Sequence, residues 1–243
     1  MKTLIVIPSR MSSIRFPNKP LALIDGIPMV KRVWQQAKKA DMGSVIVACS
    51  EKEVFDLIKS NGGDAIMTDP FLPSGTDRIF QAISTIFEVE QFDSIINLQG
   101  DMPIINPIDI KQVNNPLIQG FDMGTLITNI SPEEEKDQNI TKAKIKWIKK
   151  NELGEAVDFY KLSRKNISNI YHHVGIYSFK FQSLKKFVEL KPSENELYYK
   201  LEQWRALDAK ISIGATYVKN VPLSVDTEED LKKVENIIKA THD

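Results

Sequence analysis

The first hundred residues alternate between short β-branched runs and longer amphipathic stretches, and this alternation constrains the fold more than any other feature. The run Leu4-Ile5-Val6-Ile7 is apolar on both faces and ends at Pro8, which is typical of a buried parallel strand. Three similar runs follow, separated by apolar residues at helical spacing, with Pro28 expected as a first helical residue. The expected strands cover residues 4–7, 44–49, 65–67 and 94–98, and the expected helices cover residues 29–37, 51–61 and 79–87. This order predicts a parallel sheet with right-handed crossovers.

The second half of the chain has more strands and fewer helices between them. The expected strands cover residues 125–129, 143–148, 156–159, 174–179 and 211–218. A helix that begins near Glu194 is expected to include residues 202–208, and a closing helix covers residues 227–240 with Thr227 as its N-cap. No linker or repeat interrupts the sequence. We therefore expect a single domain over residues 1–243, of the α/β class, with a mostly parallel central sheet and a smaller mixed β extension.

The charge balance limits the possible partners. Lys and Arg total 32, as do Asp and Glu, so the formal net charge is zero, which excludes a globally basic nucleic-acid-binding protein. Residues 142–150 form a local lysine-rich run. It could be a patch for nucleic acid or anionic lipid, but a sheet-edge strand protected by lysines is the favoured interpretation. We expect no nucleic-acid partner.

The cysteine and apolar content indicates the compartment. The single cysteine, Cys49, ends an apolar run, so we expect a buried structural thiol and no disulfide, which fits a reducing compartment. No stretch approaches the roughly 18–20 apolar residues of a membrane helix. The apolar run before Pro8 is too short for a signal sequence. These features predict a cytoplasmic protein without a membrane partner.

A long loop without helical or strand periodicity lies between Pro8 and Pro28, directly after the first strand. Loops beyond roughly 12–15 residues in a compact domain are usually functional or disordered, and open α/β sheets bind ligands beyond the carboxyl ends of their strands. Arg10, Arg15 and Lys19 predict a cradle for phosphate or carboxylate; the alternative is three solvated surface cations. Neither G-x-x-x-x-G-K-[ST] nor G-x-G-x-x-G occurs, so cations and backbone would bind the phosphate.

Two aspartates are candidate metal ligands. Asp101 follows the fourth strand, and Gly100 permits a turn that directs its carboxylate toward the same edge as the long loop. An aspartate among phosphate-binding cations suits Mg²⁺, although Gly100-Asp101 could also be an ordinary turn. Asp226 precedes the N-cap of the closing helix. It could complement the positive end of that helix, or be the second carboxylate of a two-metal phosphoryl-transfer site.

Other motifs are less specific. The segment 74–78, Ser-Gly-Thr-Asp-Arg, leads into the third helix, where backbone N–H groups could bind a polar ligand and Ser74 or Thr76 could cap the helix. His172 and His173 are adjacent on an expected strand and point to opposite faces, so a histidine zinc site is not expected. The absence of G-x-S-x-G argues against a serine hydrolase.

These segments together resemble the cytidylyltransferases that activate 3-deoxy-manno-octulosonate (Kdo), the CMP-Kdo synthetase family. The resemblance runs in order across nearly the whole chain. The matching segments are Ile7-Pro8-Ser9-Arg10, Arg15-x-Pro17-x-Lys19-Pro20-Leu21, Met67-Thr68, Ser74-Gly75-Thr76-Asp77-Arg78, Asn97-Leu98-Gln99-Gly100-Asp101, His173-Val174-Gly175-Ile176-Tyr177, Leu201-Glu202-Gln203 and Val225-Asp226-Thr227-x-x-Asp230-Leu231.

The resemblance implies a Rossmann-like, three-layer nucleotide-diphospho-sugar transferase fold, usually a homodimer. It implies a reaction that joins CTP and a keto-sugar acid into a CMP-sugar and pyrophosphate with Mg²⁺, which activates Kdo for lipopolysaccharide synthesis. It also implies residue roles. The implied catalytic residues are Lys19, Arg15, Asp101 and Asp226, of which Asp101 and Asp226 hold the metal; the nucleotide-binding residues are Pro8, Arg10, Ser74 and Gln99; the sugar-binding residues are Gln99, His173, Tyr177, Glu202 and Gln203.

Two departures from the family pattern concern the sugar. Many members carry Phe-Ser-Arg-x-x-Ile-Pro after the middle hairpin, whereas residues 158–164 lack the Ile-Pro, so that either Lys161 replaces the arginine or Arg164 is displaced. Asp101 is followed by Met102-Pro103 where members often have Glu-Pro. The alternatives are a cytidylyltransferase for 8-amino-Kdo or a nonulosonate, a non-catalytic nucleotide-binding protein on this fold, and a sugar-1-phosphate nucleotidyltransferase.

Overall fold

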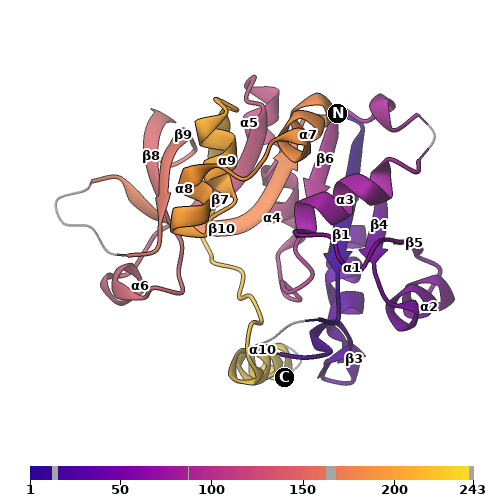
Figure 1. Ribbon diagram of the computed structural model, residues 1–243. Coiled ribbons are helices and arrows are strands. Elements are labelled where there is room, and N and C mark those ends of the chain that lie inside the picture. Colours follow the sequence, from indigo (N-terminus) through magenta and orange to yellow (C-terminus); the bar gives the residue numbers. More distant parts are fainter. Residues whose placement is uncertain (13–15, 87, 163–167, 241–243) are drawn as a thin grey trace. The chain divides into compact units, whose positions relative to one another are not determined.

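The protein, described by a computed structural model, forms two compact units. The structure describes residues 1–12, 16–86, 88–162 and 168–240. Unit 1 comprises Met1–Ile110 with Pro222–Asp243, and unit 2 comprises Lys111–Val221. The chain thus leaves unit 1 once and returns to it for its last helix (Figure 1). This division does not test the prediction of one domain over residues 1–243, which stays a prediction.

Unit 1 contains the predicted parallel sheet. Its strand order is β5-β4-β1-β6, and every neighbouring pair is parallel. All seven residues of β1 are buried, as expected for a strand covered on both faces. The strands are β1 (Thr3–Ser9), β4 (Gly43–Cys49), β5 (Asp64–Met67) and β6 (Ser94–Asn97).

The order of these strands creates a switch point. The chain moves outward from β1 to β4 and β5 and then returns to place β6 on the other side of β1. With right-handed crossovers, the helix before β6 lies on the opposite face from the two helices before it. The carboxyl ends of β1 and β6 therefore border the crevice where open α/β sheets bind ligands.

The helices of unit 1 confirm the predicted alternation, with small shifts at their ends. Pro28 is the N-cap of α1 rather than its first helical residue, because its ψ of 138° is not helical. The third helix ends at Ile83, and Phe87 lies outside the described residues. The elements are η1 (Lys19–Leu21), β2 (Leu23–Ile24), β3 (Ile27–Pro28), α1 (Met29–Lys39), α2 (Lys52–Ser60), α3 (Gly75–Ile83), η2 (Val89–Gln91) and α10 (Glu228–Ala240), with α4 (Pro107–Gln112) at the unit boundary.

Unit 2 is the predicted mixed β extension. Its strands follow the order β10-β7-β11-β9-β8, and β8 also pairs with β10, so the five strands close on themselves. The pair β7–β11 is parallel and the other pairs are antiparallel. The strands are β7 (Met123–Thr128), β8 (Lys142–Lys149), β9 (Leu153–Tyr160), β10 (Ile170–Phe179) and β11 (Ile213–Tyr217).

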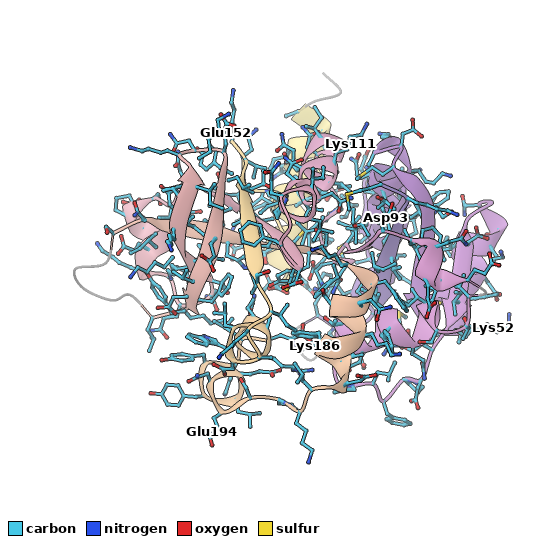
Figure 2. All side chains as sticks on the ribbon, turned by 90° about the horizontal axis from the view of Figure 1, so that it is seen from above. Lys52, Asp93, Lys111, Glu152, Lys186 and Glu194 are labelled. Carbon is cyan, nitrogen blue, oxygen red and sulfur yellow. The ribbon has the colours of Figure 1, made fainter. Side chains whose placement is uncertain are left out.

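The expected single helix from Glu194 through residues 202–208 is wrong, because two helices occupy this stretch. Lys200 adopts the left-handed conformation with φ of 54°, which ends the first helix and redirects the chain. Glu194 begins the first helix, and its side chain points outward (Figure 2). The helices of unit 2 are α5 (Asn115–Ile118), α6 (Pro132–Lys136), α7 (Phe181–Glu189), α8 (Glu194–Tyr199) and α9 (Gln203–Asp208).

The lysines of the run at residues 142–150 differ in their exposure to solvent. Lys142 is fully buried, and its ammonium group donates hydrogen bonds to the carbonyl oxygens of Asp137 and Lys161. Burial lowers the pKa of Lys142, against the opposing charges of Asp137 and Glu135. The other lysines of β8 are exposed. The strand is a sheet edge only in part, because residues 142–144 pair with β10 as well as with β9.

Two further expectations concern burial and membranes. Cys49 is buried and free, which confirms the structural thiol, and burial raises its pKa to about 12. Within the described ranges, the structure contains no helix long and apolar enough to cross a membrane.

The hydrogen bonds between Asp122 and Ser212 stabilise unit 2, and a substitution can test this contribution. Its Oδ2 accepts hydrogen bonds from the backbone N–H (3.0 Å) and the hydroxyl (2.7 Å) of Ser212. Burial opposes ionisation, but the bonds from Ser212 and the charge of Lys180 outweigh it and lower the pKa of Asp122. We expect Asp122→Ala to lower the free energy of unfolding at pH 7 by about 2 kcal/mol, because hydrogen bonds to charged groups contribute about 1.5–3 kcal/mol each.

The pH dependence has a defined sign. Because the folded state lowers the pKa of Asp122, its stabilisation is complete above the unfolded value and is lost as the pH falls through the folded one. Urea unfolding at pH 7 and pH 3 should show the difference between wild type and variant shrinking at pH 3. Glu152→Ala, which removes an exposed ion pair to Lys149, is the control and should have little effect at either pH. Equal losses in both variants would contradict the account.

Candidate functional site

A pocket of about 490 Å³ lies in unit 1 at the carboxyl ends of β1 and β6. This is the switch point of the sheet, where the sequence places the first loop and the Gly100-Asp101 turn. The lining residues come from six separate stretches of unit 1. They are Pro8, Ser9, Arg10, Ser12, Lys19, Pro20, Met29, Gly75, Arg78, Gln99, Gly100, Asp101 and Asp226.

Lys19 connects the two predicted metal carboxylates. Its Nζ lies 3.0 Å from Oδ2 of Asp101 and 3.4 Å from Oδ1 of Asp226. The side chains of Lys19 and Asp101 are only 16% and 25% exposed, so solvent screens this contact less than an ordinary surface ion pair. Asp101 and Asp226 thus meet Lys19 in one cluster, although they lie 82 and 207 positions from it in the sequence.

The return of the C-terminal segment explains how Asp226 reaches this cluster. The backbone N–H of Val225 donates to the carbonyl of Asp101 at 2.8 Å, which holds the two segments together through their backbones. Val225 is buried in an apolar cluster with residues of the β2–β3 hairpin, α1 and α10, namely Ile24, Met29, Val234 and Ile238. Figure 1 shows α10 beside this hairpin. Thr227 is confirmed as the N-cap of α10, since its Oγ1 accepts from the N–H of Asp230.

The acidic donors suit a hard divalent cation. The carboxylates of Asp101 and Asp226 both contact the ammonium group of Lys19. Their oxygens therefore face one point that attracts positive charge. Mg²⁺ is commonly held by one or two carboxylates together with substrate phosphates and water. Nowhere in the described part of the chain do three His, Cys, Asp or Glu side chains gather closely enough to hold a metal alone. The residues present therefore fit a metal that is completed by a phosphate ligand.

The backbone at the pocket requires small residues. A Cβ on Gly100 would lie 2.9 Å from the carbonyl oxygen of Pro8, so a side chain there would separate the ends of β1 and β6. A Cβ on Gly75 would lie 3.3 Å from Cγ of Pro8.

Two polar side chains near the pocket are held by hydrogen bonds. Ser74 is the N-cap of α3 and accepts a hydrogen bond from the N–H of Asp77, which confirms the predicted cap. Gln99 donates to Oδ1 of Asn97 at 2.6 Å, so its amide is fixed at the rim of the pocket.

Sequence reasoning gave no role to Arg78, which lines the pocket. Its side chain is 1% exposed, its Nη1 donates to Oγ1 of Thr68, and its buried Nη2 has no hydrogen-bond partner among the described residues. Burial lowers the pKa of Arg78, Glu51 opposes this, and Arg10 adds to it. A hydrogen-bond acceptor on a ligand would give Nη2 of Arg78 a partner. The sequence does hold one indication that Arg78 is buried, because it lies on the same side of its helix as the apolar residues Ile79 and Ala82.

Glu51 was also missed. Its Oε1 accepts from the backbone N–H of Met11 (3.0 Å) and the hydroxyl of Ser50 (2.8 Å), which anchors the start of the long loop. Arg10 is exposed and lines the pocket. Arg15 lies outside the described residues, so its predicted role is not tested.

The predicted sugar-binding residues of unit 2 form a second cluster. The rings of His173 and Tyr177 lie 5.5 Å apart on β10, on either side of a bulge between Val174 and Tyr177. The side-chain amide of Gln203 donates to the Tyr177 hydroxyl, and Glu202 acts on Tyr177 through its charge. Oε1 of Gln203 is buried and makes no hydrogen bond within the described ranges. Gln99 belongs to unit 1.

Burial sets the protonation of this cluster. Burial lowers the pKa of His173 to about 3, and His172 adds to the shift. Burial also raises the pKa of Tyr177, with a further contribution from the charge of Glu202. Oγ1 of Thr125 lies 3.0 Å from Nε2 of His173 and is within donating distance of the carbonyls of Val174 and Ile176. A threonine proton donated to either carbonyl leaves Oγ1 as an acceptor, and this arrangement favours the His173 tautomer with its proton on Nε2.

The remaining sequence expectations near this cluster have mixed outcomes. His172 contacts Glu134 whereas His173 contacts Thr125, so the two histidines do point to different partners. In the divergent segment, the carbonyl of Lys161 accepts from Lys142, and Ser163 and Arg164 lie outside the described residues.

The parallel sheet, its switch-point pocket and the cluster of cations and carboxylates define an α/β nucleotidyltransferase. The sequence matches the cytidylyltransferase family over residues 4–213. The 3-deoxy-manno-octulosonate cytidylyltransferase of Paramagnetospirillum magneticum is 42% identical over 98% of each chain. The enzyme of the same name from Parvibaculum lavamentivorans is 42% identical over 95% of this chain and 90% of its own. This chain belongs to the 3-deoxy-manno-octulosonate cytidylyltransferase family.

A solved structure supports the same assignment. CMP:2-keto-3-deoxy-manno-octonic acid synthetase, in a complex with CTP, is 30% identical and superposes with a TM-score of 0.90. The match covers 99% of this chain and 100% of that one. The predicted Rossmann-like, three-layer nucleotide-sugar transferase fold is therefore confirmed.

The protonation state of His173 can be measured directly. We expect the ring proton resonances of His173 to stay unchanged between pH 8 and pH 5, because burial lowers the pKa of His173 to about 3. NMR titration, with His173→Gln to assign the resonance, provides the measurement. A titration midpoint near the ordinary histidine value of about 6.5 would contradict a buried, neutral imidazole.

Proposed function

We propose that this chain transfers the CMP group of CTP to the anomeric hydroxyl of Kdo and releases pyrophosphate. The observation that carries the proposal is the contact of Lys19 with both Asp101 and Asp226 in the switch-point pocket. A nucleotidyl transfer needs a cation and paired carboxylates at one point. The relatives named for this reaction match almost the whole chain, which favours Kdo over 8-amino-Kdo or a nonulosonate.

The pocket of unit 1 would bind CTP. Lys19 and Arg10 would contact the phosphates, and we assign the same role to Arg15, which lies outside the described residues. Pro8, Ser74 and Gln99 would contact the nucleoside. Nη2 of Arg78, which has no hydrogen-bond partner in the described part of the chain, suits the carbonyl oxygen and ring nitrogen of cytosine, because both are acceptors. The nucleotide would thus supply this buried donor with an acceptor.

Asp101 and Asp226 would hold Mg²⁺. When bound, the metal supplies charge neutralisation at the phosphates and lowers the pKa of the attacking hydroxyl. The chain's own contribution is to keep both carboxylates at one end of the pocket through Lys19 and the Val225–Asp101 backbone hydrogen bond. This arrangement avoids the reorganisation that flexible ligands would need.

The reaction would be a direct displacement. The anomeric oxygen of Kdo forms a bond to the α-phosphorus of CTP while the bond from that phosphorus to the β-phosphate oxygen breaks, and the hydroxyl proton passes to solvent. Lys19 and Arg15 would stabilise the charge that develops on the departing pyrophosphate. A protein nucleophile is not required.

The cluster in unit 2 would bind the sugar acid. His173, Tyr177, Glu202 and Gln203 offer hydrogen-bonding groups that are largely fixed by their neighbours. For Gln99, which belongs to unit 1, contact with the sugar stays a prediction. The low pKa of His173 keeps its imidazole neutral, so it contributes a hydrogen bond rather than a charge.

The remaining parts of the proposal are Mg²⁺ as the cofactor, a homodimer, a cytoplasmic location and a product used for lipopolysaccharide synthesis. The free, buried Cys49 fits a reducing compartment. Light scattering after size-exclusion chromatography tests the dimer; a mass of one chain, 27.6 kDa, at micromolar concentration would contradict it.

Pyrophosphate release from purified protein tests the reaction. Release is expected only with CTP, Kdo and Mg²⁺ together, and not with ATP, GTP or UTP, without sugar, or with EDTA. Parallel reactions with 8-amino-Kdo and a nonulosonate identify the sugar. Release that does not require a sugar acid, or that is fastest with another nucleotide, would contradict the proposal.

Asp101→Ala tests the role of the carboxylate. We expect turnover to fall below a tenth of wild type, a loss of more than about 1.4 kcal/mol of transition-state stabilisation, while the thermal unfolding midpoint stays close to wild type. Asp56→Ala is the control, because it removes an exposed carboxylate of the same unit that pairs with Lys52. An Asp101→Ala enzyme that keeps more than a tenth of the wild-type rate would argue against a metal-binding role.

A further inference from the structure

The first turn of α10 differs from those of α6 and α8, two other helices that begin with a capping box. Oδ2 of Asp230 accepts hydrogen bonds from the hydroxyl of Thr227 (2.8 Å), the N–H of Thr227 (3.0 Å) and the N–H of Asp226 (3.2 Å). The N–H of Asp230 in turn donates to Oγ1 of Thr227 at 3.2 Å. The reciprocal bonds between residues 227 and 230 form a capping box, but the bond to Asp226 lies outside it.

Two other helices show what an ordinary capping box does in this chain. At α6, Glu134 accepts from the N–H of Ser131, and at α8, Glu196 accepts from the N–H of Ser193. The remaining carboxylate contacts of these glutamates go to side chains, namely His172 and Arg205. In α10 the acid is an aspartate, and it binds the residue that precedes the cap.

The extra bond acts on the residue that carries a site carboxylate. On one side of Asp226, the N–H of Val225 is bonded to the carbonyl of Asp101. On the other side, the N–H groups of Asp226 and Thr227 are both bonded to Asp230. Three consecutive peptide groups are therefore fixed, and the side chain of Asp226, which is 44% exposed, leaves a backbone that cannot rotate freely.

We infer that Asp230 is a positioning residue, which sets the place of the Asp226 carboxylate relative to Asp101. This inference rests on the proposed function, in which these two carboxylates hold the metal. The role depends on the length of the side chain rather than on its charge, because a single oxygen must reach both the cap and the residue before it.

Asp230→Glu separates positioning from capping. Glutamate keeps a capping box of the kind found at α6 and α8, but its extra C–C bond of about 1.5 Å moves the carboxylate so that it cannot keep the bond to Asp226 N–H together with the box. We expect the unfolding midpoint to match wild type. We expect kcat to fall about tenfold or more, the half-saturating Mg²⁺ concentration to rise about tenfold, and the KM for CTP to change less than threefold.

Asp230→Asn is the rescuing variant, because it keeps an acceptor oxygen at the same chain length without the charge. It should retain at least half of the wild-type kcat. Glu229→Gln is the matched control: Glu229 is exposed in the same first turn and pairs with Lys233, not with Asp226, so its replacement should leave kcat and Mg²⁺ dependence unchanged.

A binding measurement gives a readout besides activity. Mn²⁺ titration followed by electron paramagnetic resonance, in the presence of CTP, should show about tenfold weaker binding in Asp230→Glu and near-wild-type binding in Asp230→Asn. Wild-type kcat and Mn²⁺ affinity in Asp230→Glu would overturn the inference, as would losses in both variants that follow their unfolding midpoints. If the wild-type enzyme does not release pyrophosphate with Kdo but Asp230→Glu still weakens Mn²⁺ binding, the proposed function fails and the positioning role stands.

Discussion

The ammonium group of Lys19 between two carboxylates is the interaction on which the site depends. Two carboxylates at one end of a pocket repel each other, and a cation in contact with both offsets that repulsion. Lys19 provides that cation at 3.0 and 3.4 Å. In the proposed function, Lys19 would exchange one of these carboxylates for a phosphate of CTP. The ion pairs with Lys19 hold both carboxylates at one end of the pocket.

The fold brings the three residues of this cluster together. The strand order β5-β4-β1-β6 places the ends of β1 and β6 next to each other, which brings the segment after β1 and Asp101 to one edge. The C-terminal segment then returns to unit 1, and the buried Val225 fixes it through its bond to Asp101. Asp230 holds the other side of Asp226. The segment that carries Asp226 is therefore placed by backbone hydrogen bonds to Asp101 and Asp230.

The sequence was most informative where local periodicity and chemistry agree. The strand and helix order of unit 1, the cap at Thr227 and the cluster of Lys19, Asp101 and Asp226 were predictable, because apolar spacing and strand ends specify them. The features that were missed depend on tertiary contacts. Lys142 lies in a basic run, yet it is buried and donates hydrogen bonds to two carbonyl oxygens. Helix α8 ends at Lys200, which has a positive φ, although the surrounding residues favour a helix. Arg78 and Glu51 act through buried partners that no local pattern shows. Hydrophobic periodicity cannot report where a charged side chain finds its acceptors.

A crystal structure of the protein with CTP and Mn²⁺, analysed by anomalous scattering, tests the central claim most directly. We expect an anomalous peak coordinated by the carboxylates of Asp101 and Asp226, with the Lys19 ammonium moved onto a phosphate of CTP. A peak that contacts neither carboxylate, or a nucleotide bound away from the pocket at the ends of β1 and β6, would contradict it.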